Sequence, residues 1–307
     1  MRKEIFLSLL LGFLLDCLLG DPHSIPHPVV AIGKLISGLE KLLRGIFPKT
    51  RAGEMTAGGI LWVLTVAVSF CVPLAILRLC GLVSPWLRLI VSSIMCWQVL
   101  AAKSLKTGTI EQARYAVSMI VGRDTAALDE KAVARAAVET VAENCSDGVI
   151  APMLFFALGG APLAFAYKAV NTMDSMLGYV EMPYKNIGCI PARLDDVFNY
   201  IPARLSGLAM LLAGGILRLN FKNGWKVFKR DRYNHASPNS AQTESVCAGL
   251  LGLRLAGDAW YHGVLHKKKY IGDALREITP EDIPLSCKLM YGTTVLMLLL
   301  CLAAQAI

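Results

Sequence analysis

Six runs of apolar residues, each close to the length with which a helix crosses the hydrocarbon core of a bilayer, constrain this chain most strongly. They cover residues 5–19, 57–77, 85–102, 149–167, 201–219 and 288–306. Apolar residues make up 55% of the chain and the mean hydropathy is +0.51, which excludes an ordinary soluble domain. We therefore expect an all-α, polytopic helical membrane protein that forms a single integral membrane domain over residues 1–307.

Not all six runs are equally regular. The 5–19 run could be a signal peptide, because Arg2 and Lys3 precede an apolar stretch. Asp16 interrupts the run and no small-residue cleavage site follows, so we expect a retained helix. The 149–167 and 201–219 runs contain helix-breaking residues. These are Pro152, Gly159, Gly160 and Pro162 in the first run, and Pro202, Gly214 and Gly215 in the second. We expect broken helices there, which are tolerated at membrane depth where they line a cavity.

The basic residues predict the orientation of the chain. The segments 20–56, 103–148 and 220–287 fall on one side of the membrane if all six runs span it, and they hold 21 of the 31 Lys and Arg residues. The positive-inside rule places these polar segments in the cytoplasm. The net charge of +8 is not arranged in basic stripes with interleaved aromatic residues. We attribute this charge to the orientation of the chain in the membrane and to the binding of anionic ligands. We expect a lipid bilayer but no nucleic acid as a partner.

The stretch ETVAENCSDG at 139–148 places three carboxylates four residues apart, directly before an apolar run. We expect one helix here, from an N-cap at Asp124 to a stop at Gly148. The three carboxylates would share one face of it, at the end where the helix dipole disfavours anions. A bound Mg²⁺ would remove the repulsion, because Mg²⁺ takes carboxylate oxygens together with waters and phosphates. The alternative is a solvated face with weak ion pairs. The candidate metal ligands are Glu139, Glu143, Asn144 and Asp147.

The N-terminal stretch offers two acidic residues and a histidine. Asp16 lies inside an apolar run, and a carboxylate within a membrane is by default a functional candidate. Asp21 sits in a Gly-Asp-Pro turn, and we take both as candidate catalytic residues. His27 follows in a proline-rich corner that forbids a helical zinc pair. It could bind a ligand or cap the turn.

The segment 168–200 is rich in Asp, Asn and Arg between two apolar runs, which is costly without a ligand or partner. We suspect that it folds back towards a cytoplasmic cavity, and the alternative is an ion-paired interfacial loop. Asp174 is a candidate catalytic residue. The candidate binding residues are Asn171, Ser175, Arg193 and, just beyond the segment, Arg204.

The most basic segment contains KRDRYNHASPNSAQTES at 229–245. Arginine can clamp phosphate or carboxylate in a forked geometry, and turn amides and helix N-termini also favour anions. The alternative is a capping turn beside a lipid-binding basic patch. His235 is the candidate catalytic residue here. The candidate phosphate-binding residues are Arg230, Arg232, Ser237, Asn239 and Ser240.

Five polar motifs occur along the chain in a fixed order. They are GDPxxxPHPV at 20–29, AENxxDGVIAP at 142–152, NTxDSMxGY at 171–179, ARLDDxxNYIPARL at 192–205 and RDxxxHxSPNS at 230–240. Together they closely resemble the adenosylcobinamide-phosphate synthase family of cobalamin biosynthesis, also called CbiB or CobD. No P-loop and no Rossmann motif is present, so any nucleotide chemistry must use another architecture.

The resemblance implies a multi-pass enzyme of the inner membrane that depends on ATP and Mg²⁺. Such enzymes join (R)-1-amino-2-propanol, or its phosphate, to a propionate carboxylate of adenosylcobyric acid and form adenosylcobinamide or its phosphate. A transporter or binding protein for an anionic ligand is the alternative function, because it too would contain broken helices and buried polar residues. The oligomeric state is not set by the sequence.

Overall fold

A computed structural model of the chain describes residues 2–20, 27–100, 102–103, 129–179, 181–261 and 264–306. The chain divides into two compact units. Unit 1 consists of Met1–Ala101, Ala151–Asn199 and Cys301–Ile307, and unit 2 of Ala102–Ile150 and Tyr200–Leu300. The expectation of a single membrane domain over 1–307 stays a prediction.

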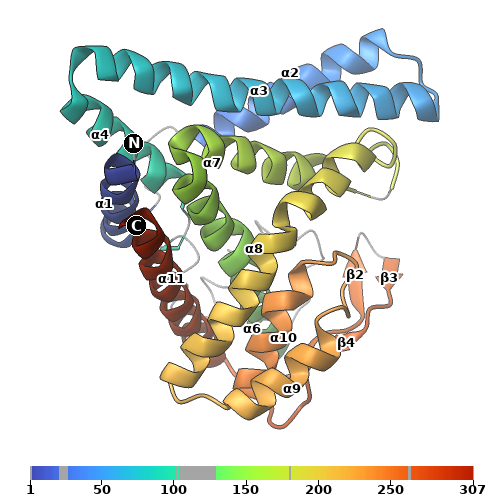
Figure 1. Cartoon of the computed structure of the whole chain (residues 1–307). Helices are drawn as coiled ribbons and strands as arrows, with labels where there is room; N and C mark the ends of the chain where they lie inside the picture. Colours follow the sequence, from blue (N-terminus) through green and yellow to red (C-terminus); the bar gives the residue numbers. More distant parts are fainter. Residues whose placement is uncertain are drawn as a thin grey trace. The chain divides into compact units, whose positions relative to one another are not determined.

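Unit 1 is built from helices. Its complete helices are α1 (Arg2–Leu19), α2 (Pro28–Ile46), α3 (Arg51–Val83), α4 (Pro85–Val99) and α7 (Ala151–Leu177). It also contains the beginning of α8 (Cys189–Ile216) and the end of α11 (Asp282–Ala306). In Figure 1, α2 and α7 lie along α3, and α1 lies against α4.

Local chemistry sets the boundaries of the longest of these helices. The Thr50 side chain caps α3 by accepting the N–H of Gly53 at 3.2 Å. At the other end Ser84 closes α3 through its N–H to Cys80 and opens α4 by accepting the N–H of Trp86. Pro85 occupies the first position of α4, where its missing N–H costs nothing.

The core of unit 1 lies where α2, α3 and α7 meet the segment after α7. Its fully buried members include Ile36, Leu61, Met173 and Ile187. Burying each such side chain contributes roughly 1.5–3 kcal/mol. A Cβ on Gly58 would lie 2.0 Å from the carbonyl oxygen of Ile187, so only glycine allows this segment to approach α3.

Unit 2 contains α6 (Glu130–Asn144), a π-helical segment (Cys145–Ile150), the rest of α8, α9 (Phe221–Asp231), α10 (Ser240–Leu251) and most of α11. Short antiparallel strands pair β1 (Leu255–Ala256) with β4 (Tyr270–Ile271), and β2 (Ala259–Tyr261) with β3 (Val264–His266). These strands were not expected. Every residue of α10 is buried, and α9 lies beside it (Figure 1). A Cβ on Gly249 would lie 2.7 Å from the Cα of Gly224, so the glycines permit this close crossing.

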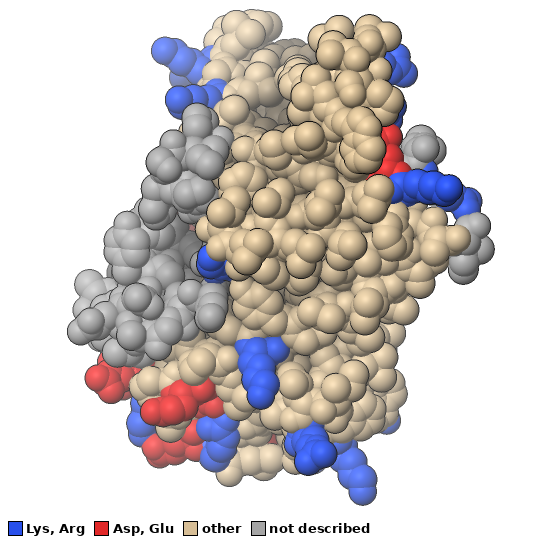
Figure 2. Space-filling model, turned by 90° about the vertical axis from the view of Figure 1, so that its left-hand side faces the viewer, with Lys and Arg blue, Asp and Glu red and all other residues tan. Residues whose placement is uncertain are grey.

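Within the described part of the chain, three helical stretches are long and apolar enough to cross a membrane: Arg51–Val83, Glu130–Leu177 and Asp282–Ala306. They contain three of the six predicted runs, which confirms a helical protein with membrane-compatible helices. Many large apolar side chains of α3 face outward, among them Val63, Val68 and Leu79. Figure 2 shows a face on which broad areas carry no Lys, Arg, Asp or Glu. Such a surface suits hydrocarbon and not water.

The structure tests the two expected broken helices separately. In α7 the backbone leaves helical geometry at Gly159 and at Gly160, whose φ is 67°. The prediction of a break in the 149–167 run is therefore confirmed. In the 201–219 run it is wrong, because α8 continues past Pro202 to Ile216. A proline removes one hydrogen bond from a helix, which packing on both sides can offset.

The helix that carries the acidic ladder also differs from expectation. Asp124 lies outside the described residues, and α6 begins at Glu130, where Asp129 accepts the N–H of Ala132 at 2.7 Å. The expected stop at Gly148 is wrong. The chain passes from α6 into a π-helical turn that contains Gly148 and then directly into α7. Asp147 thus does not lie at a helix end, and the argument from the helix dipole does not apply to it.

Candidate functional site

The turn at residues 235–240 leads into α10 and is held by its own side chains. The N–H of Ser237 donates to Nδ1 of His235 at 3.1 Å, and the N–H of Asn239 donates to the Ser237 hydroxyl oxygen at 3.2 Å. Because Nδ1 accepts a hydrogen bond, the neutral His235 ring carries its proton on Nε2. The turn therefore fixes the orientation of the histidine that the sequence selected.

One arginine contacts this turn, and a second shortly precedes it in the chain. Arg204 of α8 donates to Oδ1 of Asn239 at 3.2 Å and to the carbonyl oxygen of Tyr200 at 2.7 Å. Arg232 follows α9, and its guanidinium lies 5.0 Å from the ring centre of Tyr233. The Nε of Arg232 is buried, and no described residue forms a hydrogen bond with it or an ion pair with its guanidinium. This arginine therefore carries a positive charge that protein carboxylates do not neutralise in the described chain.

A carboxylate from α6 completes the arrangement. The Ser240 hydroxyl donates to Oε1 of Glu143 at 2.8 Å. Asn239 and Ser240 are both buried. The structure thus brings together six of the predicted site residues: Glu143, Arg204, His235, Ser237, Asn239 and Ser240. Arg232 shortly precedes the turn in the chain, and its main-chain carbonyl accepts the amide of Gln242 of α10.

The four predicted magnesium ligands do not form a ready-made cluster. Among the described residues, no three His, Cys, Asp or Glu side chains group in a way that could hold a metal ion. Glu139 accepts the N–H of Ala256 at 2.8 Å, and the Asn144 amide donates to the carbonyl oxygen of Thr140 at 2.9 Å. Asp147 lies in the π-helical turn that follows α6.

A smaller donor set does fit magnesium. Mg²⁺ is commonly held by one or two carboxylates together with phosphate oxygens and waters. Glu143 beside the Ser240 hydroxyl supplies donors of that kind, close to the arginines that could bind the phosphates. The predicted magnesium binding by Glu139, Glu143, Asn144 and Asp147 stays a prediction.

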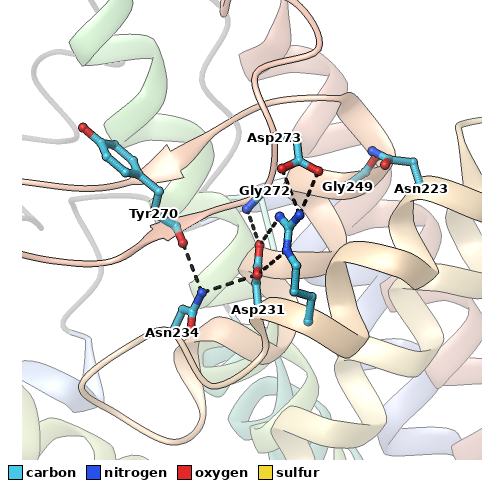
Figure 3. A network of polar contacts seen from close by, with 8 residues as sticks. Asn223, Asp231, Asn234, Gly249, Tyr270, Gly272 and Asp273 are labelled. Carbon is cyan, nitrogen blue, oxygen red and sulfur yellow. Dashed lines mark hydrogen bonds and ion pairs between the residues drawn. The ribbon is translucent and has the colours of Figure 1, made fainter.

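Arg230 has a different setting from Arg232, because it is hydrogen-bonded to Asp231 and Asp273, whose network Figure 3 shows. Its Nε and Nη2 donate to the two carboxylate oxygens of Asp231 at 2.7 and 2.8 Å, and its Nη1 donates to Asp273 at 3.1 Å. The N–H of Gly272 also donates to Asp231, at 2.7 Å. Burial alone would raise the pKa of Asp231, but the bonds from Arg230 and Gly272 lower it below its ordinary value. Arg230 therefore links α9 to the segment after β4. Its guanidinium is already paired with carboxylates, so it is not free to bind a phosphate group.

A second polar group lies in unit 1, between α7 and α8. We call it the Asp195 cluster, and it consists of Asn171, Asp174, Asp195 and Asn199. Asn199 is fully buried, and its Oδ1 accepts the hydroxyl hydrogen of Tyr167 at 2.7 Å. Burial and the neighbouring charge of Asp174 raise the pKa of Asp195 to about 7, although the amides of Asn199 and Asn171 oppose this shift. Asp195 thus titrates near neutral pH.

Two predicted residues of this segment lie outside the cluster. Ser175 is exposed, and its hydroxyl donates to the carbonyl oxygen of Asn171 at 3.0 Å. Arg193 is also exposed, and no described carboxylate pairs with it. The structure does not join these two side chains to a site.

The predicted residues near the N-terminus are placed separately. Asp16 is fully buried in α1 and lies near Cys96 of α4. His27 is the N-cap of α2, and its Nδ1 accepts the N–H of Val29 at 3.2 Å, which matches the capping alternative. Asp21 lies outside the described residues.

Comparison with known proteins identifies the family. The family model described as CobD/Cbib protein matches residues 9–290, a range that includes all five motifs. This chain belongs to the CobD/CbiB family. The resemblance inferred from the motifs is thereby confirmed.

Relatives from distant bacteria match along nearly their whole length. The cobalamin biosynthesis protein CobD of Clostridium perfringens is 48% identical over 90% of each chain. The protein of the same name from Geobacter metallireducens is 47% identical over 95% of this chain and 94% of its own. The cobalamin biosynthesis protein CbiB of Salmonella typhimurium is 43% identical over 96% of each chain. No solved structure matches the chain. Membership of the CobD/CbiB family supports a role in cobalamin biosynthesis.

Sequence analysis missed part of both sites. Asp195 and Asn199 were seen only as members of a polar stretch, although their spacing of four residues on a helix placed them on one face. Gln242 was not selected at all. Its amide donates to the carbonyl oxygens of Arg232 and Pro238 at 3.1 and 3.2 Å, and so holds the turn before α10. No sequence signal separates this glutamine from an ordinary helical one.

Proposed function

We propose that this chain is an ATP- and Mg²⁺-dependent carboxylate–amine ligase of cobalamin biosynthesis. It joins (R)-1-amino-2-propanol or its phosphate to a propionate carboxylate of adenosylcobyric acid and forms adenosylcobinamide or its phosphate. The membership of the CobD/CbiB family supports the pathway, and the five motifs support this reaction.

One structural observation carries the proposal. Arg204, a fixed histidine and a carboxylate–hydroxyl pair meet around the 235–240 turn, and Arg232 shortly precedes this turn in the chain. Arg232 has no carboxylate partner in the described part of the chain, so its guanidinium is available to an anionic ligand. An enzyme that handles nucleotide phosphates in the absence of a P-loop needs such a set of cations and turn donors.

The chain's own residues would divide the work. A carboxylate does not react with an amine until one of its oxygens becomes a leaving group, and ATP with Mg²⁺ supplies that activation. Arg204 and Arg232 would bind phosphate oxygens and stabilise the negative charge that develops on them. Glu143 and Ser240 would orient the metal-bearing phosphates, and Nε2–H of His235 would donate a hydrogen bond to the bound anion.

We further propose that the protein resides in the inner membrane as a multi-pass protein, with the 220–287 segment in the cytoplasm. The three membrane-compatible helices and the excess of Lys and Arg in the polar segments support this location. A cytoplasmic site would have direct access to ATP.

The decisive experiment uses the purified full-length protein in detergent. ATP hydrolysis is measured with adenosylcobyric acid and 1-amino-2-propanol together, with each alone and with neither, and the corrinoid product is identified by mass spectrometry. Amide formation that requires both substrates supports the ligase. Corrinoid transport by reconstituted vesicles without any ATP turnover would support the transporter instead.

A further inference from the structure

The Asp195 cluster contains two polar atoms that the described protein leaves unsatisfied. Asp195 is 7% exposed, and its Oδ1 is buried without a hydrogen-bond partner. Asn199 is fully buried, and its Nδ2 lies close enough to Asp195 to oppose the rise of that pKa, but it forms no hydrogen bond of normal geometry with a described residue. Leaving such a group unsatisfied lowers the stability of the folded protein, so buried polar atoms of this kind need a partner.

The two atoms need hydrogen-bond partners of different kinds. A carboxylate oxygen only accepts hydrogen bonds when ionised, and an amide nitrogen only donates them. The two residues are one helical turn apart on the same face of α8, with Asp174 and Asn171 facing them from α7. A fitting ligand therefore offers a cationic donor to Asp195 and Asp174 and, a short distance away, an oxygen acceptor to Asn199.

Aromatic rings close one side of this cluster. Phe155 stacks on Tyr167 at 4.8 Å and on Phe198 at 5.8 Å between ring centres. Tyr167 is hydrogen-bonded to Asn199, and Phe198 precedes Asn199 in the chain, so the stack borders the cluster directly. These rings suit a short hydrocarbon skeleton, and ring faces also attract cations.

We propose that the Asp195 cluster binds a small amino alcohol, with its ammonium group on the carboxylates of Asp195 and Asp174 and its hydroxyl or ester oxygen on Nδ2 of Asn199. The inference rests on the proposed function, because it assigns the amine substrate of the ligase to a defined place. It also extends that function to Asp195 and Asn199, which were not among the predicted site residues. Two carboxylates side by side repel each other when the site is empty, and an ammonium group removes that repulsion.

The test measures ligand binding to the full-length protein in detergent by calorimetry. The probes are 1-amino-2-propanol and 1-aminopropane, which keeps the ammonium group and lacks the hydroxyl. We expect the wild-type protein to bind 1-aminopropane at least tenfold more weakly, because the amide of Asn199 is then left unpaired. This comparison needs no substitution and does not depend on the folding of a variant.

Variants then locate the site. Asp195→Asn removes a charge-assisted hydrogen bond and should weaken both amines roughly ten- to hundredfold. Asn199→Ala should remove most of the preference for the amino alcohol. Asp196→Asn is the matched control, since it neutralises the adjacent carboxylate and should change either affinity by about twofold at most. Melting temperatures of all three variants show whether each is folded.

The outcomes separate this inference from the proposed function. If Asp195→Asn binds the amines normally while amide formation continues in the wild type, the amine site lies elsewhere and only the inference fails. If millimolar KCl displaces both amines equally and the hydroxyl makes no difference, the cluster is a site for monovalent cations and the inference is again wrong. If binding behaves as expected but no amide forms, the inference holds and the ligase assignment fails.

Discussion

Ser240 and Glu143 are joined by a hydrogen bond of 2.8 Å across 97 positions of sequence. The bond links the first residue of α10 to the acidic face of α6. It brings two motifs that lie far apart in the chain, AENxxDGVIAP and RDxxxHxSPNS, to one place.

The first prediction separates Glu143 from Asp147. Glu143→Gln should reduce the catalytic rate at least a hundredfold and raise the Mg²⁺ concentration needed for half-maximal rate, because it removes a carboxylate beside the phosphate-binding turn. Asp147→Asn, which changes a carboxylate in the π-helical segment, should lose less than about tenfold. Steady-state rates at graded Mg²⁺ give both values. Equal losses that excess Mg²⁺ restores would mean that the carboxylates gather when ligands bind, as the sequence had suggested.

The second prediction separates Arg230 from Arg232. Arg230→Ala breaks the bonds to Asp231 and Asp273 and should reduce the free energy of unfolding by about 1–2 kcal/mol. Arg232→Ala should leave stability nearly unchanged and weaken ATP or aminopropanol phosphate roughly ten- to hundredfold. Arg232→Lys should recover little, because lysine keeps the charge but loses the fork. Thermal unfolding and apparent ligand affinities measure the two effects. The reverse pattern would make Arg230 the ligand-binding arginine.

The third prediction concerns acid stability. The pKa of Asp231 is lowered in the folded protein, so its contribution to stability is present above the ordinary pKa of 3.8. It is lost as the pH falls through the lower folded value. Asp231→Asn should therefore cost about 1–3 kcal/mol at pH 7, and the gap to the wild type should shrink below pH 4. Melting curves of both proteins between pH 3 and 7 test this. A constant gap would show that the carboxylate charge does not contribute.

The fourth prediction concerns Asp195, for which stability depends on pH in the opposite direction from Asp231. Its pKa is raised from 3.8 to about 7, so the folded protein loses stability as the pH rises from about 4 through 7. Such a shift corresponds to roughly 4 kcal/mol as an upper value. Asp195→Asn should raise the melting temperature at pH 8 and have little effect at pH 4. Asp174 from α7 and Asp196 from α8 are the charged groups that face Asp195, and both favour its protonated form.

The same titration should appear in function. If Asp195 binds the ammonium group, the apparent affinity for the amine should fall as the pH drops below about 7 and should be level above it. Asp195→Asn should remove this pH dependence together with most of the affinity. A wild-type affinity that is level from pH 5 to 8 would count against Asp195 as the ammonium ligand.

The last prediction concerns orientation. A cysteine introduced at the exposed Lys222 should be protected from an impermeant thiol reagent in intact cells and should react after the cells are opened, since the 220–287 segment is expected in the cytoplasm. The parent protein with its nine native cysteines gives the background. Labelling of intact cells would reverse the topology.

The sequence by itself determined the helical membrane class, the family and the break in α7. Runs of apolar residues, ordered polar motifs and a pair of glycines are local features, and each specifies its structure through hydrophobic burial or backbone freedom within a few residues. The same local reasoning failed at Gly148, where a helix stop was expected, and at Pro202, where a broken helix was expected, because the chain stays helical at both. Packing from neighbouring elements outweighs a helix-breaking residue, and no local pattern records those neighbours.

Only the tertiary structure decided which polar residues work together. Arg230 and Arg232 look equivalent in the sequence. In the structure Arg230 belongs to a network with Asp273 and Gly272, whereas no described carboxylate pairs with Arg232. Asp195 and Asp196 are adjacent and chemically identical, but α8 buries the first against Asp174 and leaves the second only half-buried. Charge pairing and desolvation depend on distances of a few ångströms between segments far apart in the chain, so folding, and not residue type, assigns these roles.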